Sequence, residues 1–343
     1  MFQLIQASTG GAGDAKPKPK LKAGSFRELG MLLVLIALFV LFALANPRFL
    51  SSENIMDMLR NTSILGILSV GMMVVILTEG IDLSVGAVVA LSGMISALAI
   101  RDYPEMPVIV AVLISVAIGA MCGAANGWLV SKGGIIPIIA TLGTMYIFRG
   151  ITFIISNSAW VSANEMPTAF KAMATGSVGP LNNLIVVFIV VMAVFYYILN
   201  YTRTGRYFYA VGSNVEAAAI TGIRKDNILV LAYTMQGALN GLAGVLWVSK
   251  FASAQPDTAT GYEMNVIAAC VLGGVSIAGG MGRIQGLLLG VLILGVLENA
   301  LPLVDMSNFW QNCIRGLIIL AGIIISVYVK RSSISQALKR REI

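Results

Sequence analysis

Ten apolar runs limit what this chain can fold into more than any other feature of the sequence. A hydrocarbon core about 30 Å thick is crossed by a helix of about 20 apolar residues. Every backbone polar group must find a partner inside lipid, so repeated runs of this length favour a bundle of helices. The runs lie at 29–46, 63–78, 83–100, 107–130, 135–155, 183–200, 228–249, 264–278, 284–301 and 309–329. We therefore predict an all-α integral membrane protein with about ten transmembrane helices.

Composition excludes several other classes of protein. The chain is 57% hydrophobic and 11% charged, whereas soluble domains are about 25% charged. It has no histidine, and Cys122, Cys270 and Cys313 match no metal-binding spacing. A P-loop places lysine directly after glycine, and no Gly-Lys dipeptide occurs in the chain. We expect no catalytic residues, no metal and no ATPase on this chain.

The distribution of lysine and arginine predicts the orientation. With ten spans both termini lie on one side, and that side receives 16 of the 23 basic residues. Cytoplasmic loops carry the basic excess in membrane proteins, so we expect both termini in the cytoplasm. Residues 1–28 are predicted to be a disordered tail, 29–330 a single transmembrane domain and 331–343 a basic tail. We assign the net charge of +7 to this orientation and expect no nucleic-acid partner.

Two segments 181 residues apart resemble each other. Asp82 aligns with Glu263, and Val85, Ala87, Leu91 and Gly93 align with identical residues of the second segment. The spans that these acids open would run in opposite directions. Spans 2–5 and 7–10 are thus predicted to form an inverted repeat, a common plan of transporters. Chance similarity between two helices rich in Ala, Val and Gly is the alternative.

The longest inner loop, residues 201–227, contains a short helix signal. Ser213 and Glu216 have capping-box spacing, and three alanines follow Glu216. Gly222 suits a left-handed helix end. We predict a helix over 214–221 outside the membrane. It either packs only on this protein's own inner face or docks into a groove of a cytoplasmic partner.

Polar residues inside or at the mouths of the spans are candidates for a translocation path. Ionisable groups there are functional hypotheses by default, and amides and hydroxyls can bind the hydroxyls of a neutral sugar. The candidates are Asp82, Asn126, Thr141, Asn240, Glu263, Asn265 and Asn299. Such groups also hold membrane helices together, as do the small-xxx-small spacings of Gly119, Gly123 and Gly127 and of Gly237 and Gly241.

Three ordered segments resemble a known family, the permease subunits of bacterial monosaccharide ABC importers of the ribose, galactose, xylose and autoinducer-2 type. The first is Ile76-Leu-Thr-Glu-Gly-Ile-Asp-Leu-Ser-Val-Gly86. The second comprises Thr202-Arg-Thr-Gly-Arg-Tyr and Ala210-Val-Gly-Ser-Asn-Val-Glu-Ala-Ala218. The third is Gly261-Tyr-Glu-Met-Asn-Val-Ile-Ala-Ala-Cys-Val-Leu-Gly-Gly274 with Gly279-Gly-Met-Gly-Arg283. The similarity extends over about residues 30–330.

The resemblance implies a vitamin B12-importer-like (type II ABC importer) fold and a dimer with an identical or sister permease. It implies ATPase subunits that carry ATP and Mg, a periplasmic or lipid-anchored sugar-binding protein, and a place in the bacterial cytoplasmic membrane. The ATPase-coupling residues that it suggests are Arg203, Gly205, Arg206, Tyr209, Gly212, Ser213, Asn214, Glu216, Ala217, Ala218 and Gly222. Two positions differ from the family pattern. The family commonly has a small residue at position 79, where this chain has Glu79, and often has Asp at position 265, where this chain has Asn265.

We thus expect a non-enzymatic permease subunit for a ribose-like sugar, autoinducer-2 or a related neutral polyol. A branched-chain amino acid permease of the same architecture is one alternative, although its charged substrate would call for more ionic groups in the path. A sodium-coupled secondary sugar carrier is the other, since such carriers also contain inverted repeats.

Overall fold

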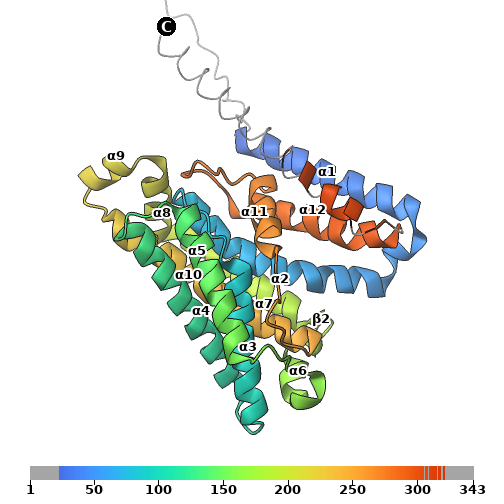
Figure 1. Ribbon diagram of the computed structural model, residues 1–343. Coiled ribbons are helices and arrows are strands. Elements are labelled where there is room, and N and C mark those ends of the chain that lie inside the picture. Colours follow the sequence, from blue (N-terminus) through green and yellow to red (C-terminus); the bar gives the residue numbers. More distant parts are fainter. Residues whose placement is uncertain (1–22, 305, 308, 315, 318–319, 321–343) are drawn as a thin grey trace, which may run out of the picture.

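The computed structural model describes residues 23–304, 306–307, 309–314, 316–317 and 320. Among these residues, eight helices are long and apolar enough to cross a membrane, which confirms an all-helical integral membrane protein (Figure 1). They are α1 (Ala23–Ala45), α2 (Ser52–Leu77), α3 (Val85–Asp102), α4 (Val108–Ser131), α5 (Pro137–Ile155), α7 (Asn183–Tyr201), α10 (Lys225–Phe251) and α12 (Ile284–Leu303).

Shorter elements connect these spans. They are the 3-10 helices η1 (Pro47–Leu50) and η2 (Ala163–Glu165), the helices α6 (Thr168–Thr175), α8 (Arg203–Ser213), α9 (Val215–Ile220) and α11 (Tyr262–Leu272), and the strands β1 (Ser177–Val178) and β2 (Leu181–Asn182). Side-chain caps begin several helices. Ser51 caps α2 and Asn182 caps α7, each accepting a hydrogen bond from a backbone N–H of the first turn.

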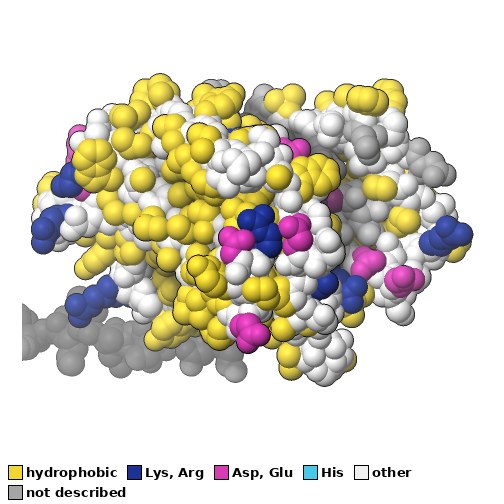
Figure 2. All heavy atoms as spheres, turned by 60° about the horizontal axis from the view of Figure 1, so that its bottom comes forward, with side chains coloured by type: hydrophobic (Ala, Val, Ile, Leu, Met, Phe, Trp, Pro, Cys, Tyr) yellow, Lys and Arg dark blue, Asp and Glu magenta, His cyan; other side chains and the backbone are white. Residues whose placement is uncertain are grey.

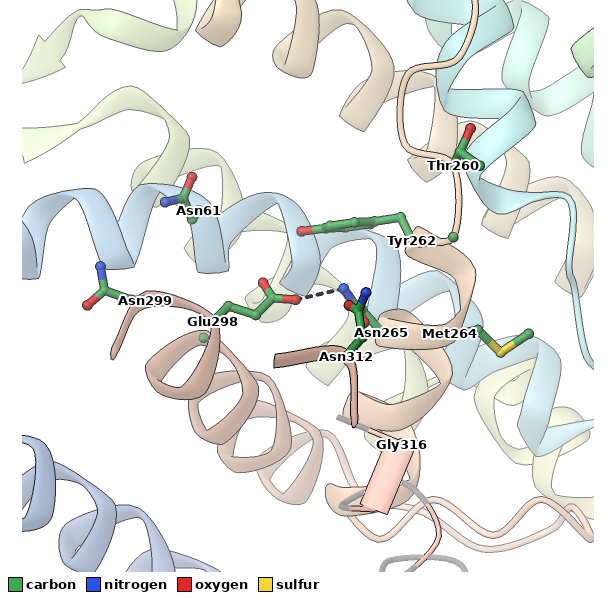
Figure 3. A pocket seen from close by; sticks show the side chains of 11 residues that line it. Asn61, Thr260, Tyr262, Met264, Asn265, Glu298, Asn299, Asn312 and Gly316 are labelled. Carbon is green, nitrogen blue, oxygen red and sulfur yellow. Dashed lines mark hydrogen bonds between the residues drawn. The ribbon is translucent and has the colours of Figure 1, made fainter. Parts of the chain in front are cut away.

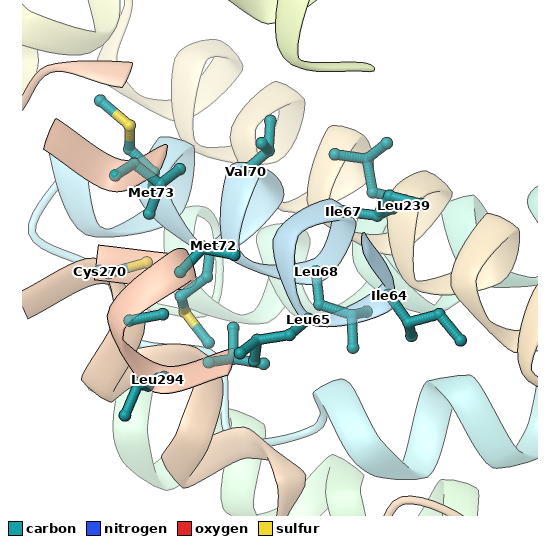
Figure 4. Close-up of a cluster of buried hydrophobic side chains, with 14 of the residues drawn as sticks. Ile64, Leu65, Ile67, Leu68, Val70, Met72, Met73, Leu239, Cys270 and Leu294 are labelled. Carbon is teal, nitrogen blue, oxygen red and sulfur yellow. The ribbon is translucent and has the colours of Figure 1, made fainter. Parts of the chain in front are cut away.

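Helix α2 lies at the centre of the hydrophobic core. Every residue from Thr62 to Leu77 is buried, whereas most spans expose one apolar face. Figure 4 shows its side chains packed with Leu239 of α10, Cys270 of α11 and Leu294 of α12. A helix that is apolar all round belongs inside a bundle, and α2 is that helix here.

Glycines allow α10 to contact α4 and α3 backbone to backbone. A Cβ on Gly237 would overlap the carbonyl oxygen of Gly119, and one on Gly123 would overlap that of Tyr233. A Cβ on Gly93 would lie 2.9 Å from the carbonyl oxygen of Gly244. The small-residue spacing therefore marks real helix contacts, as the sequence predicts.

Loops predicted to lie inside do share one face of the molecule. Lys132, after α4, forms an ion pair with Asp226 at 3.2 Å, and Arg283, before α12, forms one with Glu28 of α1 at 3.2 Å. The Tyr209 hydroxyl of α8 donates to the carbonyl oxygen of Gly282 at 2.9 Å. These contacts place α9, the 279–283 loop and the start of α1 at the same end of the bundle.

The opposite face is formed by the remaining connections. Val161 and Ala254 exchange backbone hydrogen bonds of 3.0 Å in both directions, which joins the segment after α5 to the segment after α10. Ser249, near the end of α10, donates to the carbonyl oxygen of Phe170 in α6. In Figure 1, α6 and β2 accordingly lie far from α9.

Helix contacts on the two sides of the bundle mirror each other. Helix α10 packs on α3 and α4, and α2 packs on α11 and α12. Helices α3 and α4 contact each other, as α11 and α12 do, and α2 contacts α10 across the middle. These three kinds of contact in the first half therefore have counterparts in the second.

Apolar side chains cover the outside of the bundle. Figure 2 shows them gathered over the left and centre of the visible face, with acidic and basic side chains at its centre and edges. Helix α5 contributes many of the apolar side chains, such as Ile139 and Ile154. Such a surface suits lipid or a second membrane protein, not water.

The predicted span 264–278 is wrong in extent. Helix α11 has 11 residues and ends at Leu272, too few to cross a bilayer. The reason is Gly273-Gly274, where Gly274 adopts a left-handed φ of +85° that a continuing helix does not allow. The chain then returns to the α9 face through the irregular segment 273–283.

Two other boundaries differ from expectation or cannot be compared. Helix α1 begins at Ala23, within the predicted tail 1–28. The tenth run, 309–329, lies mostly outside the described residues, and 331–343 lies wholly outside them.

The glycine contact predicts that Gly237→Ala destabilises the protein. Its methyl group would force α10 away from Gly119, and overpacking of this kind costs about 1–3 kcal/mol. We expect a lower unfolding temperature of the detergent-solubilised protein.

Gly143→Ala in α5 is the matched control, because a Cβ there meets nothing within 4 Å. Equal unfolding temperatures of the two variants would contradict the close approach of α4 and α10.

Candidate transport and coupling sites

The predicted coupling loop forms two consecutive helices at the end of the bundle. Thr202 caps α8, its hydroxyl accepting the Gly205 N–H at 3.1 Å, and α9 follows α8 after the single residue Asn214. The sequence predicts a helix over 214–221, and α9 confirms it in substance. Gly222 ends α9 with a φ of +82°, as expected for a left-handed helix end.

The predicted capping box is wrong. Asn214, not Ser213, caps α9, and its side-chain oxygen accepts the Ala217 N–H at 2.9 Å. Ser213 is the last residue of α8, and its hydroxyl donates to the carbonyl oxygen of Gly280. The sequence pattern predicts no helix over 203–213. Helix α8 occupies these residues and ends at Ser213, so α9 begins one residue later than predicted.

The predicted coupling residues divide into a buried and an exposed group. Gly205, Gly212 and Ala218 are buried, whereas Arg203, Arg206, Ser213, Asn214, Glu216, Ala217 and Gly222 are exposed and Tyr209 is half-buried. Ile220, which the sequence reading did not include, is 88% exposed at the end of α9. Ile220 is a large apolar side chain on the same exposed helix as Glu216. It is the residue of α9 best suited to enter a groove of another protein.

Close packing anchors α8 to the core. A Cβ on Gly205 would overlap the carbonyl oxygen of Ile198, and one on Gly212 would overlap that of Leu77. Burial raises the pKa of Tyr209 and nearby Arg283 lowers it. The phenol therefore stays protonated near neutral pH and keeps its hydrogen bond to Gly282.

Glu79, one of the two departures, lies next to this anchor. Its φ is +64°, a conformation that costs a residue with a side chain roughly 1–2 kcal/mol. Gly280 N–H donates to the Leu77 carbonyl oxygen at 3.0 Å, and Gly279 contacts the Glu79 side chain. The end of α2, the end of α8 and the 279–280 turn thus meet at one point.

A polar cavity of about 660 Å³ lies among α2, α11, α12 and the residues after α12 (Figure 3). The Asn265 amide donates to the Glu298 carboxylate at 2.7 Å. The side chains of Asn61, Tyr262 and Asn299 also line the cavity, and Lys250 hydrogen-bonds to Asn61. Amide, carboxylate and hydroxyl groups of this kind can hydrogen-bond the hydroxyls of a neutral polyol.

The seven predicted path residues do not come together. Asn265 and Asn299 line the cavity, and Asn299 also exchanges two amide hydrogen bonds with Asn54 at 2.9 and 3.0 Å. Glu263, half-buried, lies elsewhere, near Gly86.

The other four are fully buried between helices. Ser84 donates to Asp82 at 2.6 Å and accepts from Asn126 at 2.8 Å. The Thr141 hydroxyl donates to the Ile81 carbonyl oxygen, and Asn240 accepts from Gln236. The contacts of Asp82, Asn126 and Thr141 favour the alternative role of holding separate segments of the bundle together, whereas the hydrogen bond of Asn240 lies within α10.

Sequence reasoning left out some of the residues that line the cavity. Glu298, Tyr262, Asn61 and Asn312 belong to this group. The consecutive polar pair Glu298-Asn299 within an apolar run is a signal that could have found part of the site.

Comparison with known proteins places the chain in a transport family. The model of a family described as branched-chain amino acid transport system / permease component matches residues 54–323. The chain belongs to this family of permease components. No solved structure matches it.

Individual relatives indicate the type of permease within this family. The ribose import permease proteins of Haemophilus influenzae and Escherichia coli K12 are 40% and 41% identical, over 87% and 85% of this chain and 92% of each relative. The L-arabinose ABC transporter permease protein of Azospirillum brasilense is 35% identical over 96% of this chain and 97% of its own length. The resemblance to permeases of monosaccharide ABC importers is thereby confirmed.

The observed cap predicts that Asn214→Ala loosens α9, whereas Ser213→Ala does not. Loss of an N-cap side chain costs about 1 kcal/mol, so amide hydrogen exchange in 215–220 should become several-fold faster. Equal exchange rates in the two variants, or a larger effect of Ser213→Ala, would contradict the Asn214 cap and support the predicted capping box.

The cavity predicts a charge interaction between positions 265 and 298. Asn265→Asp places a second carboxylate beside Glu298, and two unit charges about 4 Å apart repel by about 1–4 kcal/mol in this kind of environment. We expect a lower unfolding temperature, restored by adding Glu298→Gln. A double variant no more stable than Asn265→Asp would show that the two side chains do not interact.

Proposed function

We propose that this chain forms the translocation path of an ATP-driven importer for a ribose-like monosaccharide or a related neutral polyol. The observation that carries the proposal is the match, over more than nine tenths of their lengths, to relatives named as ribose and L-arabinose permeases. An autoinducer 2 import system permease protein of Enterobacter sp. is also 34% identical over 92% of this chain. Those relatives favour a sugar over a branched-chain amino acid.

The polar cavity supports a neutral substrate. Amides supply most of its polar lining, and Glu298 accepts a hydrogen bond from Asn265. A polyol can exchange its bonds to water for bonds to such groups without bringing a charge into the membrane, where a charge is costly. Tight binding would belong to a separate sugar-binding protein outside the membrane.

Orientation follows from the shared face of the basic loops. We propose that the α9 end of the bundle faces the cytoplasm. The positive-inside rule supports this, because Lys132, Arg203, Arg206, Arg224 and Arg283 lie at that end. The proposal thus keeps the predicted orientation, with both termini on the cytoplasmic side of a bacterial inner membrane. The segment 252–261 faces the outside.

Energy would enter through α9 from partner ATPase subunits that carry ATP and Mg. The exposed Ile220 and Glu216 are the contact candidates. Ala218 faces the core from α9, and Gly205 and Gly212 anchor the preceding helix α8. Helix α8 would pass the motion to the 279–283 turn, which it contacts through Tyr209 and Ser213.

We propose that spans 2–5 and 7–10 form an inverted repeat in a permease of ten spans. The fold would be that of a type II importer, like the vitamin B12 importer, and the permease would be a dimer. It is supported by the reciprocal packing of α2 with α11 and α12 and of α10 with α3 and α4. In this arrangement α11 and the segment 273–283 together take the place of one span.

The proposal predicts that uptake depends on ATP and on Ile220. The permease is reconstituted in proteoliposomes with its ATPase and binding protein, and radiolabelled D-ribose and L-arabinose uptake is measured. We expect uptake with internal ATP and no requirement for a sodium gradient. Ile220→Asp should lower uptake at least tenfold because a charge replaces the exposed apolar contact.

Ile220→Leu is the matched control and should retain uptake, since it keeps the apolar volume. Uptake that collapses with the sodium gradient and ignores ATP would support a secondary carrier instead. Normal ATP-driven uptake by Ile220→Asp would remove α9 from the coupling role.

A further inference from the structure

A second hollow lies beside the polar cavity, on the face opposite α9. It has a volume of about 550 Å³, within the range of roughly 300–1,000 Å³ typical of small-molecule sites. Trp247 and Phe251 at the end of α10, Tyr262 at the start of α11 and the loop 252–261 between them form its walls. We call it the aromatic cleft.

Three aromatic rings form a corner of the cleft. The rings of Trp247 and Tyr262 are perpendicular, with centroids 5.1 Å apart, and the rings of Trp247 and Phe251 meet at 45° with centroids 5.2 Å apart. The face of an aromatic ring carries partial negative charge, which suits the weakly positive C–H groups on the flat side of a sugar ring. Phe251 is 51% exposed, although the Lys250 ammonium lies over its ring, 4.8 Å from the centroid.

Polar side chains line the rest of the cleft. Gln255, Asp257, Thr258 and Thr260 supply amide, carboxylate and hydroxyl groups. Asp257 and Thr260 are exposed. An aromatic wall beside hydrogen-bonding groups matches a ligand with one apolar face and a rim of hydroxyls.

The loop that carries these groups is held rigid. The Arg149 guanidinium of α5 donates to the carbonyl oxygens of Pro256 at 2.8 Å and Thr258 at 2.7 Å. Ala254 pairs with Val161. A loop fixed before its ligand arrives loses less entropy on binding.

The same loop contains two unfavourable backbone conformations. Ala252 and Ala259 adopt φ values of +47° and +56°. This conformation is unfavourable for alanine, whose side chain can form no compensating hydrogen bond. Strain of this kind tends to occur at binding and switch regions. The two residues bracket the segment that supplies Gln255, Asp257 and Thr258.

We propose that the aromatic cleft is a weak receiving subsite for a neutral monosaccharide, at the outer end of the path. The inference rests on the proposed transport of such a sugar. The sugar ring packs on Trp247 or Phe251, and its hydroxyls bond to Gln255 and Asp257. Thr260 and Tyr262 line both the cleft and the polar cavity, so the subsite adjoins the cavity.

Direct binding tests the subsite. The full chain in nanodiscs is mixed with millimolar D-ribose or L-arabinose, and saturation transfer to the sugar C–H protons is measured by NMR. We expect a signal for the wild type that falls at least fivefold in Trp247→Leu and in Asp257→Asn, while Trp247→Phe keeps part of it. L-Leucine should give no signal at this site.

Trp160→Leu is the matched control, because Trp160 is 59% exposed beside Val161 and does not line the cleft. It should retain the wild-type signal. Unfolding temperatures of all variants are measured, and Asp257→Asn, at an exposed loop position, provides a test that does not depend on the packing of Trp247. Equal signals from Trp247→Leu, Asp257→Asn and Trp160→Leu would overturn the proposal.

Uptake by the reconstituted importer separates this proposal from the one on which it rests. If the wild type takes up no sugar, the transport function fails. If it takes up sugar and Trp247→Leu and Asp257→Asn behave as Trp160→Leu does, only the subsite fails. If these variants weaken the binding protein's attachment while saturation transfer is unchanged, the cleft is a docking surface for that protein and the subsite is wrong.

Discussion

The direct contact of α10 with α4 and α3 fixes the rest of the bundle. Inside lipid no hydrophobic force drives helices together, so close packing and hydrogen bonds must do it. Gly237 lies against Gly119, and Gly244 lies against Gly93, which brings the backbones into contact. Helix α10 has 27 residues, about 40 Å at 1.5 Å per residue. It therefore connects α9 at one end with the aromatic cleft at the other, and its fixed position determines where both lie.

Helix α8 also connects the α9 end of the bundle to the core, through its contacts with α2. Gly212 lies against the Leu77 carbonyl oxygen at the end of α2, and the Gly280 N–H donates to that same oxygen. Glu79 holds a left-handed conformation beside this junction. Displacement of α9 would press on a junction where α2, α8 and the turn before α12 are already in contact, and both α2 and α12 line the polar cavity. A strained residue at such a point lowers the cost of moving it, because part of the strain can be released.

The sequence predicts long elements well because the bilayer imposes their length. Eight of the ten predicted runs correspond to spanning helices of the described chain. The run 264–278 misled because hydropathy does not register Gly273-Gly274, whose backbone ends α11 despite apolar neighbours. The capping box failed for a different reason: Ser213 and Asn214 are both good caps, and the contact of Ser213 with Gly280 decides between them.

The candidate path was harder to predict, because the role of a polar residue depends on how its helix is rotated. Asn126 and Asn299 look alike in the sequence, yet Asn126 faces Ser84 inside the bundle and Asn299 faces the cavity. Periodicity cannot separate these cases when a span is apolar on every side. The aromatic cleft lies further beyond the reach of pattern reading. Its rings come from two helices and its polar groups from a loop shaped by Arg149, which is more than 100 residues earlier in the chain.

A path for a neutral sugar also explains why so little charge is needed. A transport path that bound its substrate tightly would slow the substrate's release, so weak contacts in sequence serve better than one strong site. The aromatic cleft offers ring faces and a few acceptors, and the polar cavity offers mainly amides. The Asn265 amide donates to Glu298 and so orients its carboxylate. Asp at position 265 would place two carboxylates together, so the departure to Asn265 and the presence of Glu298 are consistent as a pair.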